Sequence, residues 1–350
     1  MTALQPTKLS GIARPADVGA MLAEICEHFV EHSDVVHADG VATLKSQDWT
    51  IHIVTAEDVL QIEISTLGEE ALAVTRTMFA EHLFYFAGDE PFSLEWSKPA
   101  AKVKPPGFHE ATVVGVEDVT PRMRRVTLSV ADVSPFLDRN MHVRLLVPPK
   151  GQTPVWPHLQ ENGRIGWPDE LLVRIYTIRC VDAEARQISL DILQHPAEGV
   201  ATPGADFARV AEIGQQVAIM GPGGGGLPDA QDIFFAGDES ALPAIARMVE
   251  DAPSGVTMRA IIEVEDAGEE QPFGGLSPVH VEWLHRSSYS VGDAHVLVDR
   301  VKTALKDVED ETFVWFAGEK ADVRTIKRHL AEKARDRRRQ YVAWYWEKES

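Results

Sequence analysis

The chain has 350 residues, of which 44% are hydrophobic and 25% are charged, and its formal net charge is −20. This length suits two or three domains, and the composition is typical of a globular protein. The negative charge excludes nucleic acid and anionic membranes as main partners, because both require an electropositive surface.

Apolar runs and cysteines narrow the class of protein further. No apolar run approaches the roughly 18–20 residues that span a bilayer, and residues 1–6 do not resemble a signal peptide. We therefore expect a cytoplasmic protein without stable membrane association. Cys26 and Cys180, the two cysteines, exclude a disulfide scaffold and a four-cysteine iron–sulfur site built from this chain alone. Electron transfer would have to depend on an organic cofactor.

Residues 1–98 are predicted to form a small α+β domain. Apolar residues at three- and four-residue steps predict helices over 16–32 and 69–87. Short strands are predicted over 41–44, 50–54, 59–65 and 92–96.

Three histidines lie on these helices. His28 and His32 are four residues apart, and His82 is on the second helix. Such a set can bind a metal or haem, but a histidine pair is more often incidental, so we assign no metal site. Through residues 26–29, 81–83 and 94–96 the segment resembles a small α+β family of unknown function, which implies no activity.

A proline-containing linker is predicted over residues 98–107, and the pattern of 107–228 is all-β. The predicted strands are 112–118, 124–130, 142–147, 171–179, 187–193 and 216–220. Short strands at regular spacing predict a closed barrel.

Residues 229–350 alternate between strand and helix, which predicts a parallel sheet with crossover helices. Strands are predicted over 233–236, 257–264, 279–283, 312–316 and 341–345, and helices over 241–250, 294–305 and 321–334.

The most informative motif ends the strand that begins at Leu171. It contains Arg174, Tyr176 and Thr177. A flavin dinucleotide requires an aromatic face for its ring, a hydroxyl at the ring's polar edge and a guanidinium for its pyrophosphate. Alone, the motif could be an ordinary strand end, since Tyr and Thr favour strands. It is followed downstream by residues that suit a phosphate-binding turn, namely His195, Gly199, Ala201 and Thr202.

Two further loops follow strands. The glycine-rich residues 220–224 allow close approach of a nucleotide to the backbone, or they form a hinge between domains. This loop is not a G-x-G-x-x-G helix opener, which disfavours an ordinary Rossmann dehydrogenase. The turn after strand 233–236 opens a helix, where negative charge is favoured, and a pyrophosphate could bind there. Its candidate residues are Asp238, Glu239, Ser240 and Ala241, of which the two acids could instead be helix caps.

The end of the chain carries three more candidate groups. Arg286 and Ser287 follow a predicted strand and could contact a nucleotide 2′-phosphate, or Arg286 is an exposed loop residue. Ala317, Gly318 and Glu319 end the strand over 312–316 and are candidate cofactor-binding residues on the nicotinamide side. A basic stretch could form a rim that captures an anionic substrate, or it finishes a helix. Its arginines are Arg335, Arg337, Arg338 and Arg339.

Together these motifs resemble the siderophore-interacting protein family, the FAD-dependent ferric-siderophore reductases of the ferredoxin-reductase superfamily, over roughly residues 107–346. The resemblance implies an antiparallel Greek-key barrel that holds FAD and an α/β domain that binds NAD(P)H, with NADPH slightly favoured. Arg174 is then assigned to the pyrophosphate, Tyr176 to the flavin ring face and Thr177 to the flavin N5 edge. Val200 and Phe207 depart from the family's usual Pro and Trp, which weakens individual side-chain assignments.

The implied activity is NAD(P)H-dependent reduction of Fe(III)–siderophore to Fe(II). The protein would supply positioning rather than an acid or a base, because hydride passes directly to the flavin. Two alternatives stay open: a flavin reductase that serves a ferredoxin-type partner, and a non-enzymatic siderophore- or flavin-binding protein.

Overall fold

The structure is a computed structural model that describes residues 6–30, 33–137, 140–194, 202–290 and 295–348. It contains two compact units. One comprises Met1–Phe108 and Thr153–Leu171, and the other comprises His109–Gln152 and Leu172–Ser350. The predicted domain boundaries at 98, 107 and 228 stay predictions.

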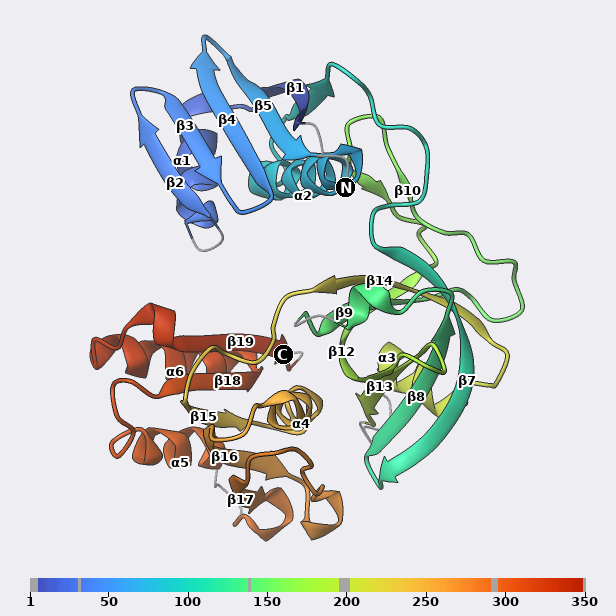
Figure 1. Ribbon diagram of the computed structural model, residues 1–350, viewed down its shortest axis with the longest axis vertical. Helices are drawn as coiled ribbons and strands as arrows, with labels where there is room; N and C mark the ends of the chain where they lie inside the picture. Colours follow the sequence, from blue (N-terminus) through green and yellow to red (C-terminus); the bar gives the residue numbers. More distant parts are fainter. Residues whose placement is uncertain (1–5, 31–32, 138–139, 195–201, 291–294, 349–350) are drawn as a thin grey trace. The chain divides into compact units, whose positions relative to one another are not determined.

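The first unit is a six-stranded antiparallel sheet with helices α1 (Val18–Phe29) and α2 (Glu69–Ala87) against one face (Figure 1). Its strands, in their order across the sheet, are β2 (Asp34–Ala38), β3 (Val41–Lys45), β4 (Trp49–Ala56), β5 (Val59–Leu67), β1 (Pro6–Arg14) and β6 (Ser93–Trp96). Burial alternates along β5, so its apolar residues face the helices. The side chain of Asp17 caps α1 by accepting the Ala20 N–H at 2.8 Å.

Strands β1 and β2 were not predicted from the sequence. The buried face of β1 carries Leu9, Gly11 and Ala13, of which the two small residues Gly11 and Ala13 give little apolar contrast. Gly11 is required there, because a Cβ atom would overlap the Trp96 ring. Strand β2 is an exposed edge strand, so it shows no apolar alternation.

Residues 153–171 leave the barrel region and pack on the first unit. They form a two-stranded ribbon of β10 (His158–Leu159) and β11 (Ile165–Gly166). The Trp96 indole N–H donates to the Asn162 carbonyl at 2.8 Å, and Glu81 accepts the Ile165 N–H at 2.8 Å. The first unit is therefore built from two separate stretches of chain.

The second unit begins with a closed antiparallel barrel, as predicted. Its strands, in order around the barrel, are β12 (Leu172–Asp182), β13 (Gln187–Leu193), β8 (Met123–Val130), β7 (Phe108–Thr120), β14 (Gln216–Gly223) and β9 (His142–Val147). Inward-facing aliphatic residues such as Val143 and Leu190 fill the interior. Helix α3 (Pro203–Val210), which was not predicted, packs against this core through Phe207.

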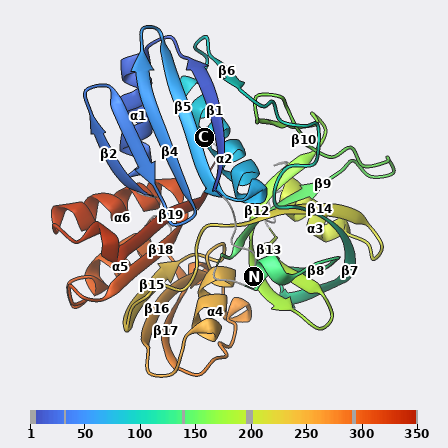
Figure 2. The same ribbon diagram turned by 45° about the horizontal axis from the view of Figure 1, so that its top comes forward.

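The rest of the second unit is a five-stranded parallel sheet, also as predicted. Its order is β17 (Val279–His285), β16 (Thr257–Val264), β15 (Asp232–Gly237), β18 (Phe313–Glu319) and β19 (Gln340–Trp346). Strand β15 is apolar on both faces, because helices cover both. Helix α4 (Leu242–Asp251) packs on one face, whereas α5 (Val296–Ala304) and α6 (Lys320–Glu332) pack on the other (Figure 2).

None of the helices in the described ranges has the length and apolarity needed to cross a bilayer.

Candidate functional site

Strand β12 carries the three predicted flavin residues. Because side chains alternate along a strand, Arg174 and Tyr176 share one face. The antiparallel register places Tyr176 opposite Val143 and Thr177 opposite His142 of β9. Tyr176 is half-buried against the barrel core, and Thr177 is buried.

The amino end of α3 lies against this face of β12. A Cβ atom at Gly204 would overlap the Tyr176 hydroxyl oxygen and would lie 3.6 Å from the Cγ atom of Arg174. Helix amino termini present unpaired N–H groups and partial positive charge. Arg174 is exposed, and no carboxylate in the described part of the chain pairs with it. A guanidinium and a helix terminus thus meet at one place, which suits a pyrophosphate.

The environment of Tyr176 keeps it neutral. Burial raises the pKa of the Tyr176 hydroxyl to about 12, so the phenol stays protonated at neutral pH. The ring offers an uncharged surface for an aromatic ligand.

The predicted phosphate-binding turn is described only in part. Thr202 precedes α3, and its N–H donates to the Asp206 carboxylate at 3.1 Å. The other predicted residues of this turn, His195, Gly199 and Ala201, lie outside the described residues. Gly204 was not singled out from the sequence, although it lies just after Thr202.

Two predicted turns meet at the carboxyl edge of the parallel sheet. Strands β15 and β18 are neighbours, with Gly237 opposite Ala317. A Cβ atom at Gly237 would overlap the Ala317 carbonyl oxygen, and one at Gly318 would lie 3.1 Å from the Asp238 carboxylate. The 238–241 turn therefore lies beside the turn that contains Gly318, as their positions after parallel strands predict.

Asp238 holds this turn together from inside. Its carboxylate accepts the Ser240 N–H at 2.9 Å and the Trp346 indole N–H at 2.7 Å. Burial raises the pKa of this carboxyl above its ordinary value. The side chains of Asp238 and Ala241 are both buried, so the turn offers a ligand its backbone groups rather than the Asp238 carboxylate.

Glu319 is a helix cap in the structure. It accepts the N–H groups of Ala321 at 2.5 Å and Asp322 at 3.3 Å, at the start of α6. Its carboxylate therefore faces the helix that follows.

Arg286 is held by three carboxylates. Its guanidinium forms two hydrogen bonds with the buried Glu239, lies 3.3 Å from Glu263 and lies 3.5 Å from Glu265. These ion pairs raise the pKa of Arg286 against the opposing effect of burial. The exposed Ser287 donates its N–H to the Glu265 carbonyl at 2.9 Å. The predicted contact with a 2′-phosphate stays a prediction, and any such phosphate would approach a guanidinium that already has acidic partners.

The basic stretch lies at the opposite edge of the sheet. Arg335 donates to the Thr312 carbonyl and, at 2.8 Å, to the Glu309 carbonyl, just before β18. Arg339 donates to the Glu311 carbonyl at 2.8 Å. Because the strands are parallel, these residues lie at their amino ends. The geometry therefore favours the alternative in which the arginines complete the crossover into β19, and it does not support a substrate rim beside the carboxyl edge.

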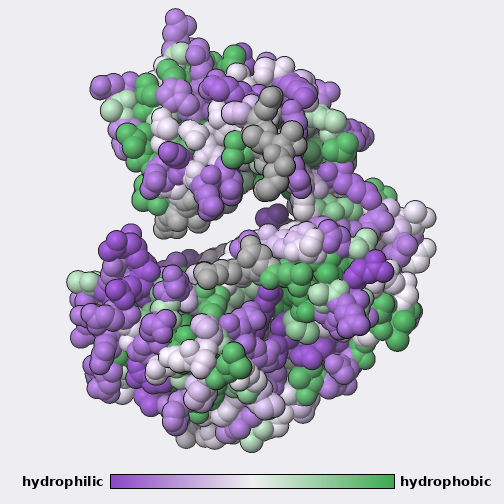
Figure 3. All heavy atoms as spheres, in the orientation of Figure 1, coloured by the Kyte–Doolittle hydropathy of each residue, from purple (hydrophilic) through white to green (hydrophobic). Residues whose placement is uncertain are grey.

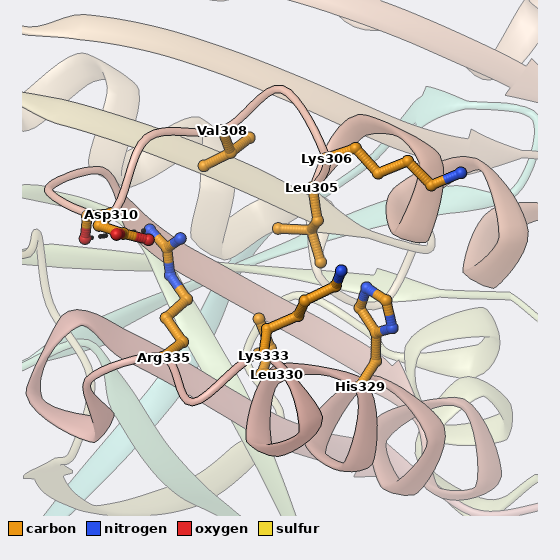
Figure 4. Close-up of a pocket in the computed structure, with 8 residues that line it drawn as sticks. All are labelled: Leu305, Lys306, Val308, Asp310, His329, Leu330, Lys333 and Arg335. Atoms are coloured by element: carbon orange, nitrogen blue, oxygen red, sulfur yellow. Dashed lines mark hydrogen bonds between the residues drawn. The ribbon is translucent and has the colours of Figure 1, made fainter.

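A pocket beside Arg335 is lined by basic side chains, and their presence is also explained by the helix ends there. Figure 4 shows Lys306, His329 and Lys333 around it, with Arg335 turned toward Asp310. Helices α5 and α6 both end there, and the partial negative charge of helix carboxyl ends favours cations. Figure 3 shows hydrophilic side chains over α5 and α6. The remaining arginines are Arg338, paired with Asp336 at 2.9 Å, and Arg337.

Charged residues join the barrel to α4. Arg179 of β12 forms two hydrogen bonds of 2.6 Å with Glu250, and the buried Arg247 donates to the Ile178 carbonyl at 3.0 Å. Asp191 is buried and accepts two hydrogen bonds from Arg125, at 2.7 and 2.9 Å. The sequence analysis missed this network, although Arg179 follows the flavin motif directly.

The histidines of the first unit form an aromatic contact. The rings of His28 and His82 lie 4.8 Å apart, beside Phe29 and Phe86. Within the described ranges, no group of three or more His, Cys, Asp or Glu side chains is arranged to hold a metal ion.

Three family models match the chain. The siderophore-interacting FAD-binding domain matches residues 112–226, and the siderophore-interacting protein model matches residues 230–349. A domain described as an uncharacterized protein conserved in bacteria matches residues 13–97, which confirms the predicted resemblance of this segment.

Individual relatives match parts of the chain. The ferric vibriobactin reductase of Vibrio cholerae is 31% identical over 176 residues, or 48% of this chain and 63% of that protein. The NADPH-dependent ferric-chelate reductase of Escherichia coli is 26% identical over 249 residues, or 68% of this chain and 92% of that protein. The chain spans less than two thirds of some curated relatives, 48% of a Mycobacterium tuberculosis protein and 63% of the Vibrio reductase.

A solved structure also matches about two thirds of the chain. The siderophore utilization protein from T. fusca has a TM-score of 0.59 and 33% identity, and the match covers 69% of this chain and 92% of that chain.

The two roles proposed for the basic stretch predict different effects of substitution. We expect Arg335→Ala to lower the stability of the protein by about 1–2 kcal/mol, because it leaves carbonyl groups before β18 without their donor. Arg337→Ala is the matched control, since no hydrogen bond or ion pair of this side chain is found in the described structure. Urea unfolding of both variants measures the difference. If the two variants were equally stable and both had a raised Michaelis constant for the substrate, the arginines would instead form a substrate rim.

Arg286→Ala tests the carboxylate cluster. We expect a loss of about 2 kcal/mol in stability, because Glu239 is left buried without its partner. Michaelis constants for NADH and NADPH should rise together, since Glu239 belongs to the 238–241 turn. A rise for NADPH alone would show that Arg286 contacts the 2′-phosphate. Arg300→Ala is the control, because Arg300 forms a similar but more exposed pair with Glu282.

Proposed function

Because this chain belongs to the siderophore-interacting protein family, we propose that it is an FAD-containing, NAD(P)H-dependent reductase of ferric siderophores. The match to the T. fusca siderophore utilization protein, at 33% identity over 92% of that chain, carries the family assignment. The names of the Vibrio and Escherichia relatives, ferric vibriobactin reductase and NADPH-dependent ferric-chelate reductase, support the reaction type.

The observation that best supports the proposal is the meeting of Arg174, Tyr176 and the amino end of α3. Arg174 and the helix terminus would hold the FAD pyrophosphate, which carries negative charge. Tyr176 would cover the isoalloxazine ring with a neutral face, and Thr177 would lie at its polar edge. Gly204 fits this arrangement, because any side chain there would displace the Tyr176 hydroxyl.

Nucleotide binding is proposed at the carboxyl edge of the parallel sheet. The 238–241 turn precedes α4, and Gly318 brings the neighbouring turn close to it. The backbone N–H groups at this edge would receive the phosphates of NAD(P)H. Helix α4 connects this edge to β12, because Arg247 contacts the strand at Ile178, next to Thr177.

The chain's own residues would act by positioning. FAD, when bound, can accept two electrons from a nicotinamide and release them singly to iron. No side chain is assigned as an acid or a base, since the transfer needs reactants held close and in line. The ferric siderophore as substrate and the cytoplasm as location are parts of the same proposal.

Anaerobic reduction of the purified protein tests this function. We expect a yellow protein that NADH or NADPH bleaches, and whose colour returns when a ferric siderophore is added. Formation of Fe(II), trapped by a ferrous chelator, should match the electrons supplied. Bleaching without siderophore turnover would indicate a reductase for another acceptor, such as a ferredoxin. A protein that is not bleached would be a binding protein only.

The role of Arg174 has a direct test. We expect Arg174→Ala to weaken FAD binding by about 1.5–3 kcal/mol, because a charged hydrogen-bond donor is lost. Arg186→Ala is the matched control: Arg186 is exposed in the turn between β12 and β13, at the other end of β12 from Arg174. Fluorescence titration of apoprotein with FAD measures both affinities. Unchanged affinity in Arg174→Ala would show that the pyrophosphate lies elsewhere.

A further inference from the structure

His142 joins three parts of the second unit. It begins β9, where the register places it opposite Thr177 of β12 and opposite Gly223 of β14. Its ring extends to Tyr345 on β19, the last strand of the parallel sheet, and the two rings meet edge to face with centroids 5.6 Å apart. The sequence analysis gave no role to either residue.

The hydrogen bonds of His142 determine where its proton lies. The Nδ1 atom is 3.2 Å from the Gly224 carbonyl oxygen, which can only accept a hydrogen bond, so Nδ1 carries the proton. The Nε2 atom is 3.0 Å from the Tyr345 hydroxyl. In a neutral ring Nε2 is an acceptor, so Tyr345 donates to it. The neutral imidazole with its proton on Nδ1 satisfies both contacts, with Tyr345 as the donor to Nε2.

The loop over His142 is built around the ring. Gly225 has a φ of +71°, and a Cβ atom there would lie 2.7 Å from the His142 ring. This loop leads from β14 toward β15, so it is the connection between the barrel and the sheet. The imidazole therefore contacts the barrel, the connection and the far strand of the sheet at once.

The far strand leads directly to the proposed nucleotide site. Tyr345 is followed by Trp346, whose indole N–H donates to the Asp238 carboxylate at 2.7 Å. A continuous set of contacts thus runs from Thr177 at the proposed flavin edge, through His142 and Tyr345, to the 238–241 turn.

We infer that His142 is a positioning residue whose neutral form holds β19 against the barrel, and whose protonation disturbs this contact and the alignment of the two proposed cofactor sites. A protonated ring has N–H groups at both nitrogens, so the hydrogen bond with Tyr345 must reverse, with the hydroxyl as acceptor, and a positive charge enters a buried site near Arg247. The consequence for hydride transfer depends on the proposed function, whereas the contact itself does not.

The surroundings of His142 favour the neutral form. Burial lowers its pKa, and the nearby positive charge of Arg247 on α4 lowers it further, while the hydrogen bond to Gly224 acts in the opposite direction. On the partner side, burial raises the pKa of Tyr345, so its hydroxyl stays protonated; this hydroxyl also shares a hydrogen bond with Tyr341 and lies near the Asp238 carboxylate. Since the pKa of His142 is lower in the folded protein than in the unfolded chain, the neutral contact is intact above about pH 6.5, and it is lost only as the pH falls through the lower pKa of the folded state.

The contact is tested first in the apoprotein. Nitrogen-15 NMR of the imidazoles should show His142 protonated on Nδ1 at pH 7.5, with a pKa below about 6.5. In Tyr345→Phe the pKa of His142 should rise, because the neutral form loses a hydrogen bond. Protonation on Nε2, or an unchanged pKa in Tyr345→Phe, would overturn the inference whether or not the protein binds FAD.

The positioning role is tested by the rate of bleaching with saturating NAD(P)H between pH 5.5 and 8. We expect His142→Ala to slow bleaching about tenfold or more at pH 7.5, since misplaced reactants lose effective concentration. His142→Gln should retain most of the rate, because its amide can donate to Gly224 and accept from Tyr345, but it should lose the fall at acid pH. A fall that persists in His142→Gln would assign the pH dependence to another group.

His109→Gln is the matched control. His109 is a second barrel histidine whose pKa burial lowers, but its ring packs on Phe136 instead of on the parallel sheet. This variant should keep both the rate and its pH dependence. Loss of the pH dependence in His109→Gln would overturn the assignment to His142. A protein that is not bleached at all would refute the proposed function and leave the NMR result to decide the contact.

Discussion

The second unit depends on the buried charged contacts between β12 and α4. Arg247 is buried and bonded to the backbone of the strand, while Arg179 is paired with Glu250 and lies near the buried Asp191. Removing one member would leave an uncompensated charge in a low-dielectric environment, which costs more than the pair contributes. The barrel strand with the flavin motif and the helix that opens at the 238–241 turn are therefore fixed to each other, and all other features of the site are arranged around this junction.

The sequence was sufficient where local pattern and tertiary environment agree. Strand β15 is apolar throughout because it is buried on both faces, and its pattern, together with the turn that follows, placed Asp238 correctly at the carboxyl edge. Strand β1 escaped prediction because two of its buried residues, Gly11 and Ala13, are small, and because the apolar Ile12 faces outward and breaks the alternation. Helix α3 is short and follows a stretch of Gly and Pro, so its pattern resembles a loop.

Charged side chains were harder to place, because their partners come from distant parts of the sequence. Arg286 was considered as a phosphate ligand or an exposed residue, but Glu239 and Glu263, from two other strands' ends, occupy its guanidinium. For Arg335 and Arg339 the topology favours the structural alternative: residues that precede a parallel strand lie at the edge opposite to those that follow one. The substrate-rim hypothesis relied on the composition of the basic stretch and did not consider at which edge of the sheet the stretch lies.

Because the first unit is built from two stretches of chain, its folding during synthesis and its isolation as a fragment are both affected. Its sheet and helices are complete by residue 96, yet the groups that satisfy Trp96 and Glu81 arrive only with residues 162–165, after barrel strands β7, β8 and β9 have been synthesised. During synthesis, the first unit can therefore complete its contacts only after part of the barrel has been made. A fragment that ends at the linker would lack residues 153–171. A single boundary in the sequence therefore does not define this domain.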